Sequence, residues 1–237
     1  MRQTVPKLFT AKHVTMRKLS KKVTKLVCFD LWETLVNEPL TSEASWEPFA
    51  KAYPDKISWP KIHTLIAEIA QRKDQSTEKS TKEILANFGV TDDLLVAEIG
   101  KRWEYSCDQV ALFSETIEAL LGLRKAGFKL GLITNTSRYG WEATDKRCLL
   151  SNHFDYLALS FALGYVKPEP EIFDFIDRTS GFSGGEIVMV GDSYKNDFKA
   201  PRGRGWGSIL LDRFNANKYP EAKPVIQSLL QLQDTLL

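Results

Sequence analysis

Four short segments of the chain carry side chains that can attack, bind or neutralise an anion. They are Asp30 with Thr34, Thr134 with Asn135, Lys167 before Pro168, and Asp192 with Asp197. A carboxylate can act as a covalent nucleophile, and two carboxylates around a short turn suit a hard cation, which prefers oxygen ligands. Plainer interpretations stay open for each segment alone, because Asp often caps a helix, Thr-Asn often forms a turn, and Lys-Pro often lies in a solvated loop.

Apolar runs supply the elements that must position these side chains. Short continuous runs are typical of strands covered on both faces. They predict strands at residues 25–30, 129–134, 156–160, 187–190 and 208–211. Helices are expected at residues 115–126, 169–179, 196–203 and 222–237, and one more, without set bounds, between the strands at 129–134 and 156–160. This alternation predicts an α/β fold with a doubly wound parallel sheet, in which ligands bind beyond the carboxyl ends of the strands.

A helical block interrupts the alternation after the first strand. The sequence from about residue 38 to 113 predicts no strand, only helices at residues 44–53, 59–72, 80–88 and one capped by Thr91 that runs through Trp103. The block is most simply an insertion. We therefore expect a poorly ordered basic arm at 1–24, a core domain made of 25–37 and 114–237, and a helical cap domain at 38–113.

Composition narrows the function classes. The net charge of +2 by itself implies no polyanionic partner. The sequence lacks a basic patch with interleaved aromatic residues, so we expect no binding to nucleic acid. No stretch of about 18 apolar residues predicts a membrane span. The cysteines at 28, 107 and 148 form no Cys-x-x-Cys pair, which favours a reducing compartment. Because a reducing compartment is favoured, we expect a cytoplasmic protein. Residues 1–29 hold eight basic and no acidic residues, as organelle-targeting segments do, so targeting to an organelle is the alternative.

The four segments, in this order over roughly residues 25–213, resemble the haloacid dehalogenase-like (HAD) superfamily, and the helical insertion resembles its C1 cap. The resemblance implies that Asp30 attacks phosphorus and forms an aspartyl-phosphate. It also implies a Mg²⁺ cofactor held by Asp30, the carbonyl of Trp32, Asp192 and Asp197, the last directly or through water.

The same resemblance assigns the remaining residues. Lys167 would steady Asp30 and the phosphoryl oxygens, so that Asp30, Thr134 and Lys167 form the expected catalytic set. The expected substrate-binding set comprises Leu31, Trp32, Thr134, Asn135 and Lys167. The implied function is a Mg²⁺-dependent phosphatase acting on a small phosphorylated metabolite.

One residue departs from the family pattern. Trp32 stands where family phosphatases have a second Asp that protonates the leaving group, and an indole cannot exchange a proton at neutral pH. Glu33 could act as a substitute acid, but we favour the interpretation that it is an ordinary solvated side chain. The substitution leaves two main alternatives open, a 2-haloacid dehalogenase and a binding or regulatory protein with little catalysis, while phosphonate cleavage fits Trp32 poorly.

Aromatic residues of the helical block admit two interpretations. Trp46, Trp59, Trp103 and Tyr105 could line a pocket over Trp32. Aromatic residues at helical spacing more often form a core, and this is the interpretation that we favour.

Overall fold

The computed structural model describes residues 24–37 and 42–236, and its centre is a six-stranded sheet in which every pairing is parallel. The strands are β1 (Leu26–Phe29), β4 (Lys129–Thr134), β5 (Tyr156–Leu159), β6 (Ile187–Gly191), β7 (Gly207–Leu211) and β8 (Val225–Ile226). Their order is β5-β4-β1-β6-β7-β8. The predicted doubly wound parallel sheet is confirmed, and all five predicted strands occur within one or two residues of their expected bounds.

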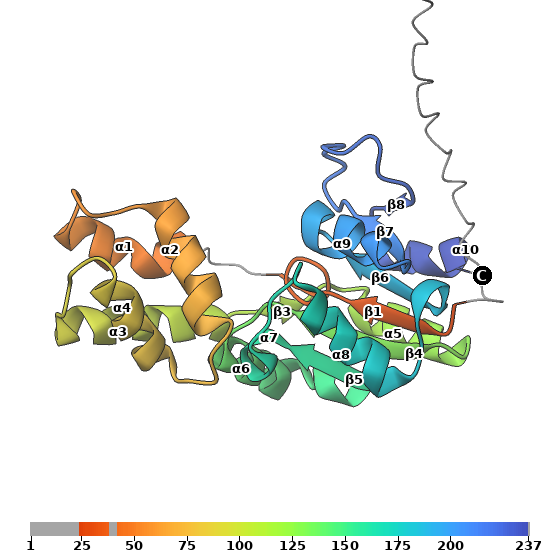
Figure 1. The fold of residues 1–237 in the computed structure, drawn as a ribbon, viewed down its shortest axis with the longest axis horizontal. Helices are drawn as coiled ribbons and strands as arrows, with labels where there is room; N and C mark the ends of the chain where they lie inside the picture. Colours follow the sequence, from red (N-terminus) through yellow and green to blue (C-terminus); the bar gives the residue numbers. More distant parts are fainter. Residues whose placement is uncertain (1–23, 38–41, 237) are drawn as a thin grey trace, which may run out of the picture.

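Helices cover both faces of the sheet, as the apolar strands require (Figure 1). Side chains of β1 alternate between the faces: Val27 and Phe29 pack with α5 (Thr116–Lys125) and α10 (Leu232–Leu236), whereas Leu26 and Cys28 pack with α8 (Pro170–Ser180). The described residues of this part form seven more helical segments: α6 (Arg138–Cys148), η2 (Leu150–His153), α7 (Ser160–Leu163), η3 (Gly184–Glu186), η4 (Tyr194–Lys199), α9 (Ala200–Gly203) and η5 (Leu229–Gln231). Burial on both faces explains why the strands lack polar alternation.

The inserted block has an apolar core of its own. It consists of α1 (Ser42–Ala52), α2 (Trp59–Leu65), the π-helix η1 (Ile66–Ala70), α3 (Thr77–Ala86) and α4 (Asp93–Asp108). The buried residues of its cluster all lie between Trp46 and Ile99, and none is shared with the clusters that flank the sheet. Figure 1 shows the block beside the sheet, with β3 (Ala111–Leu112) near the junction.

Two predictions of secondary structure are wrong. Residues 38–113 do contain a strand, because β3 (Ala111–Leu112) pairs antiparallel with β2 (Val36–Asn37) in a ladder too short to produce a periodic pattern. The helix expected over 222–237 is helical only in η5 (Leu229–Gln231) and α10. Its first part becomes β8, since the N–H groups of Leu210 and Asp212 bind the carbonyls of Pro224 and Ile226.

Helix starts differ from the prediction where a different residue provides the cap. Ser76 accepts a hydrogen bond from the Lys79 N–H, so α3 begins three residues earlier than expected. Asp92, and not Thr91, caps α4 by accepting from the two following N–H groups at 94 and 95. The arm predicted at 1–24 lies outside the described residues except for Thr24, which is buried.

Candidate active site

Three carboxylates and one ammonium meet at the carboxyl ends of the central strands. Asp30 follows β1, Asp192 follows β6, and Asp197 lies in η4. Each offers an oxygen within 4.8 Å of the others. The Lys167 Nζ donates to Asp30 Oδ1 and to Asp197 Oδ1, both at 2.7 Å. The structure thus brings together residues that the sequence separates by up to 167 positions.

The turn after β6 needs glycine to hold Asp197 in place. A Cβ on Gly191 would lie 2.4 Å from Asp197 Cγ, closer than any real contact of this kind. The other Asp197 oxygen accepts a hydrogen bond from the Ser193 N–H at 3.0 Å, and the Ser193 hydroxyl caps η4. The Gly-Asp-Ser sequence therefore forms a tight turn that directs two carboxylates to one point.

Asn135 fixes the main chain at Lys167. Its side-chain amide donates to the Lys167 carbonyl at 2.9 Å and accepts from the Lys167 N–H at 2.7 Å. This reciprocal pair ties the end of β4 to the loop before α8. Asn135 was predicted to offer its main-chain N–H to a ligand, and its side chain has this second, positioning role that the sequence did not reveal.

Two threonines beside the cluster keep hydroxyl groups without a partner. Thr34 Oγ1 and Thr134 Oγ1 are fully buried, and neither makes a hydrogen bond among the described residues. A buried unpaired hydroxyl costs roughly 1–3 kcal/mol, so such groups commonly mark a place where another polar group binds. Thr134 lies at the tip of β4, as predicted.

The charges of the cluster do not balance. With all three carboxylates ionised, the cluster would carry a net charge of about −2 against one ammonium, and two of the three carboxylates are buried. Desolvation, followed by the charge of Asp30, raises the pKa of Asp192 to about 6 although its side chain reaches the surface. Burial also raises the pKa of Asp197 against the attraction of Lys167. Lys167 stays charged, because burial lowers its pKa less than Asp197 and Asp30 raise it. The oxygen-only donor set and its excess negative charge fit a hard divalent cation.

The turn after Asp30 is held from outside by Arg213, which the sequence reasoning missed. Arg213 donates to the carbonyls of Glu33 (3.3 Å) and Thr34 (2.6 Å), pairs with Glu115, and lies over the Phe113 ring. Glu33 adopts a left-handed conformation (φ 53°), which is strained for a residue with a side chain. Arg213 is the second residue after β7, close to the place that Asp30 has directly after β1, and this similar position is the signal that was available.

Leu31 and Trp32 occupy different places in this turn. The Leu31 side chain is fully buried in the core, so only its main chain faces the site. The Trp32 ring is half-buried against the same core, and its Cζ2 lies 3.4 Å from the place of a Cβ on Gly140 in α6. A Cβ at position 140 would lie closer still to the hydroxyls of Ser137 and Thr136, both at 3.1 Å, so glycine leaves room for the indole beside α6.

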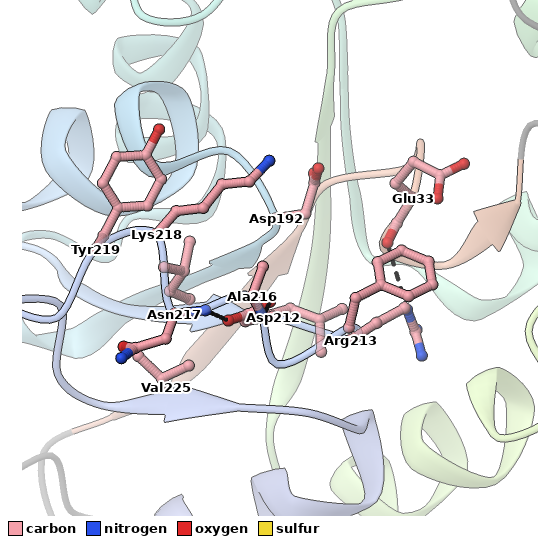
Figure 2. A pocket seen from close by; sticks show the side chains of 12 residues that line it. Glu33, Asp192, Asp212, Arg213, Ala216, Asn217, Lys218, Tyr219 and Val225 are labelled. Carbon is pink, nitrogen blue, oxygen red and sulfur yellow. Dashed lines mark hydrogen bonds between the residues drawn. The ribbon is translucent and has the colours of Figure 1, made fainter.

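A pocket of about 200 Å³ opens beside the cluster (Figure 2). It is lined by Glu33, Asp192, Leu210, Leu211, Asp212, Arg213, Phe214, Ala216, Asn217, Lys218, Tyr219 and Val225. The Asp212 carboxylate accepts from the N–H groups of Ala216 and Asn217, and Tyr219 stacks on Tyr194 with ring centroids 4.1 Å apart. These contacts shape the loop after β7, which sequence analysis did not connect with the site.

The aromatic residues of the helical block lie mostly in its core, as we favoured. Trp46 is buried, and Trp59 and Trp103 are half-buried against the same cluster. Tyr105 is 59% exposed and packs in no cluster of the described residues.

The order of the strands and the residues at their ends agree with a known family. A model of the haloacid dehalogenase-like hydrolases matches residues 24–203. The chain belongs to this family. The parallel sheet and the carboxylate that follows β1 agree with this membership.

Several proteins of the family are similar to this chain. Bifunctional epoxide hydrolase 2 from Mus musculus is 28% identical over 167 residues, which make up 63% of this chain and 28% of that protein. Glyceraldehyde 3-phosphate phosphatase from Methanopyrus kandleri is 24% identical over 208 residues, 84% of this chain and 88% of that protein. The chain thus spans under a third of the mouse protein and most of the archaeal one.

Solved structures share the fold over nearly their whole length. A HAD phosphatase from Thermococcus onnurineus is 26% identical with a TM-score of 0.60, covering 89% of this chain and 97% of that one. A 2-haloacid dehalogenase from Pseudomonas syringae is 25% identical with a TM-score of 0.63, covering 90% and 97%. Among the described residues, no helix combines the length and apolarity needed to cross a bilayer.

Proposed function

We propose that this HAD-like hydrolase is a Mg²⁺-dependent phosphatase that acts on a small phosphorylated metabolite through an aspartyl-phosphate on Asp30. The observation that carries the proposal is the convergence of Asp30, Asp192 and Asp197 within 4.8 Å, with the Lys167 ammonium 2.7 Å from two of them. Similarity to phosphatases of the family supports it.

Asp30, Asp192, Asp197 and the carbonyl of Trp32 would hold the Mg²⁺. Their fit rests on the oxygen-only donor set and on the uncompensated negative charge described above. When bound, the ion neutralises charge on the carboxylates and on the phosphoryl group, and so allows two anions to approach each other.

Asp30 supplies the nucleophile. One of its oxygens is bound to Lys167, which leaves the other to attack phosphorus. The new bond joins this oxygen to phosphorus, and the bond to the leaving oxygen breaks, with the electron pair going to the leaving group. Water then attacks the same phosphorus, the bond to Asp30 breaks, and inorganic phosphate and the free carboxylate result.

The surrounding residues hold the transferred group. Lys167 stays within reach of its oxygens while it orients Asp30, and the unpartnered hydroxyl of Thr134 with the N–H of Asn135 binds another oxygen. Leu31 would contribute only its main-chain N–H, since its side chain is buried.

Trp32 restricts the leaving group. Because the indole cannot give a proton, the leaving oxygen must depart as an anion, which favours acyl and aryl phosphates over alkyl phosphates. We further propose that residues 38–113 act as a cap domain over the core of 25–37 and 114–237. The separate apolar core of the block supports this division.

A dehalogenase and a binding or regulatory protein are the two alternatives to the phosphatase. The Pseudomonas dehalogenase shares the fold, and a dehalogenase would use Asp30 on carbon without metal. Asp192 in the carboxylate cluster favours the phosphatase, since dehalogenation needs no such cation site. The absence of an acid at position 32 favours the third possibility, a binding or regulatory protein with little turnover.

One assay separates the three functions. Acetyl phosphate and 4-nitrophenyl phosphate are offered to wild type and Asp30→Asn, each with Mg²⁺ or a chelator, beside a 2-haloacid. Phosphate release that is lost with chelator and in the variant supports the phosphatase. Halide release without metal supports the dehalogenase, and silence in every arm supports the binding function.

A further inference from the structure

One arginine joins the helical block to the loop that carries Lys167. Arg72 follows η1 at the end of the segment that begins with α2, and it is half-buried. Its guanidinium donates Nη1 to Glu169 Oε2 at 2.8 Å and Nη2 to Glu169 Oε1 at 2.6 Å. This bidentate geometry makes the pair stronger and more directional than a single contact.

Arg72 contacts the loop before α8 at a second point. Its Nη1 also lies 3.3 Å from the carbonyl oxygen of Gly164, and its own carbonyl lies 3.9 Å from the place of a Cβ on that glycine. The Arg72 side chain thus forms hydrogen bonds to both ends of the loop between residues 164 and 169. Glu68, four residues earlier, pairs with the same guanidinium: its Oε2 lies 3.1 Å from the Arg72 Nε, and its Oε1 accepts from Nη2 at 3.4 Å.

Glu169 connects Arg72 to the main chain next to Lys167, whose side chain belongs to the carboxylate cluster. Glu169 occupies the N-cap position of α8 without making a side-chain cap hydrogen bond, and its Oε2 accepts a hydrogen bond from the Val166 N–H at 3.1 Å. Lys167 is the next residue, and its Nζ holds Asp30 and Asp197. A continuous chain of polar contacts therefore runs from the helical block, through Glu169, to the main-chain N–H of Val166, the residue before Lys167.

A second ion pair between the block and the core lacks this connection. Arg138, at the start of α6, pairs with Asp74 of the block. Neither residue makes a hydrogen bond to residues 164–169 among the contacts of the described chain. The pair Arg138–Asp74 thus provides a control that joins the same two parts of the molecule.

We propose that Arg72 is a positioning residue that makes the placement of Lys167 depend on contact between the helical block and the core. With the block seated, Arg72 holds Glu169, and the loop from 164 to 169 keeps Lys167 against Asp30. With the block lifted away, the loop loses two of its anchors. The part of the inference that concerns turnover rests on the proposed phosphatase function, whereas the structural coupling does not.

Amide hydrogen exchange tests the coupling without substrate. In Arg72→Met, the Val166 amide is expected to exchange about tenfold faster than in wild type, because the Glu169 carboxylate that binds it is released to solvent. This increase in exchange rate corresponds to the low end of the range for a charge-assisted hydrogen bond, because the Glu169 side chain is about a third exposed to solvent. Arg138→Met is expected to leave this amide within twofold. Unchanged exchange at Val166 in Arg72→Met, or an equal rise in both variants, overturns the proposal.

Kinetics with acetyl phosphate and Mg²⁺ then test the consequence for turnover. Arg72→Met is expected to lower kcat about five- to tenfold with less than a twofold change in KM, and Arg72→Lys to recover part of the loss through a single contact. Arg138→Met is expected to lower neither parameter more than twofold. A loss of kcat of equal size in both arginine variants means that the block merely has to stay attached, and contradicts the proposal.

The two hypotheses fail in different ways. If wild type releases no phosphate, the phosphatase function fails while the exchange at Val166 still decides the coupling. If wild type is active but Arg72→Met retains full kcat and wild-type exchange, the coupling fails while the phosphatase function stands.

Discussion

Replacing Trp32 by Asp gives the most informative perturbation of the site, because it adds the one group that the family pattern has and this chain lacks. A positioned general acid contributes about 10²–10⁴ in rate, which is roughly 3–5 kcal/mol of activation free energy. This gain applies only when the leaving oxygen needs a proton. We expect Trp32→Asp to hydrolyse an alkyl phosphate such as glycerol phosphate at least 10²-fold faster than wild type, at nearly unchanged acetyl phosphate rates.

The substitution also removes packing, and the structure limits that loss. Truncation of a fully buried Trp costs about 3–5 kcal/mol, and the half-buried Trp32 ring should cost about 2 kcal/mol. A domain with an ordinary stability of roughly 5–15 kcal/mol remains folded after such a loss. Urea denaturation measures this cost directly, and the acetyl phosphate rate reports whether the active site survives.

Trp32→Asn is the matched control. It removes the same ring and has nearly the same shape as Asp, yet it cannot serve as an acid. The assay is therefore the ratio of alkyl to acetyl phosphate turnover in the three proteins. An alkyl phosphate rate in Trp32→Asp no higher than in Trp32→Asn would refute the reasoning that position 32 limits proton donation.

Three further predictions concern the parts that hold the cluster. Gly191→Ala should weaken Mg²⁺ binding more than tenfold in titration calorimetry and destabilise the fold by about 1–3 kcal/mol, because the new Cβ would lie 2.4 Å from Asp197 Cγ. Gly203→Ala, which has no atom within 4 Å of the new Cβ, should change neither quantity as much, and equal effects would contradict the prediction. Arg213→Met should destabilise the protein by about 1–3 kcal/mol in urea, since it removes the ion-pair partner of the partly buried Glu115 and the donor to two main-chain carbonyls; a loss below about 0.5 kcal/mol would be inconsistent with this account. Mg²⁺ affinity should fall about fourfold between about pH 7.5 and about pH 5.5, because desolvation and a neighbouring carboxylate raise the pKa of Asp192 to about 6 and the ion must displace the proton; an affinity that is equal or higher at the lower pH would show that this carboxyl does not bind the ion.

The sheet was predictable because its strands are short apolar runs between clear helices. Parallel strands buried on both faces leave an unmistakable run of apolar residues, as in β1 and β6. β8 left no such run, since it has two residues and one of them, Val225, is half-exposed at the edge of the sheet. Its pairing is fixed by hydrogen bonds to β7, which no local pattern encodes.

The cluster was predictable because its residues lie at the ends of strands or in the short segments that follow or precede a helix. Asp30 and Asp192 follow directly from this rule. The residues that hold the cluster in place were not predictable from local sequence. Asn135, Arg72 and Arg213 act through contacts between segments 32, 97 and 180 positions apart. The places of Asn135 and Arg213 just after strands point to the site but not to these contacts, and nothing near Arg72 in the sequence distinguishes it from a solvated side chain.

The central claim is that Asp30 is the nucleophile in a pocket that shares one cation with Asp192 and Asp197. Co-crystallisation with Mg²⁺ and beryllium fluoride, a mimic of the phosphoryl group, tests it most directly. The account predicts beryllium bonded to an Asp30 oxygen, with the ion bound to all three carboxylates directly or through water. A fluoride adduct absent from Asp30, or a Mg²⁺ that binds away from Asp192, would contradict it.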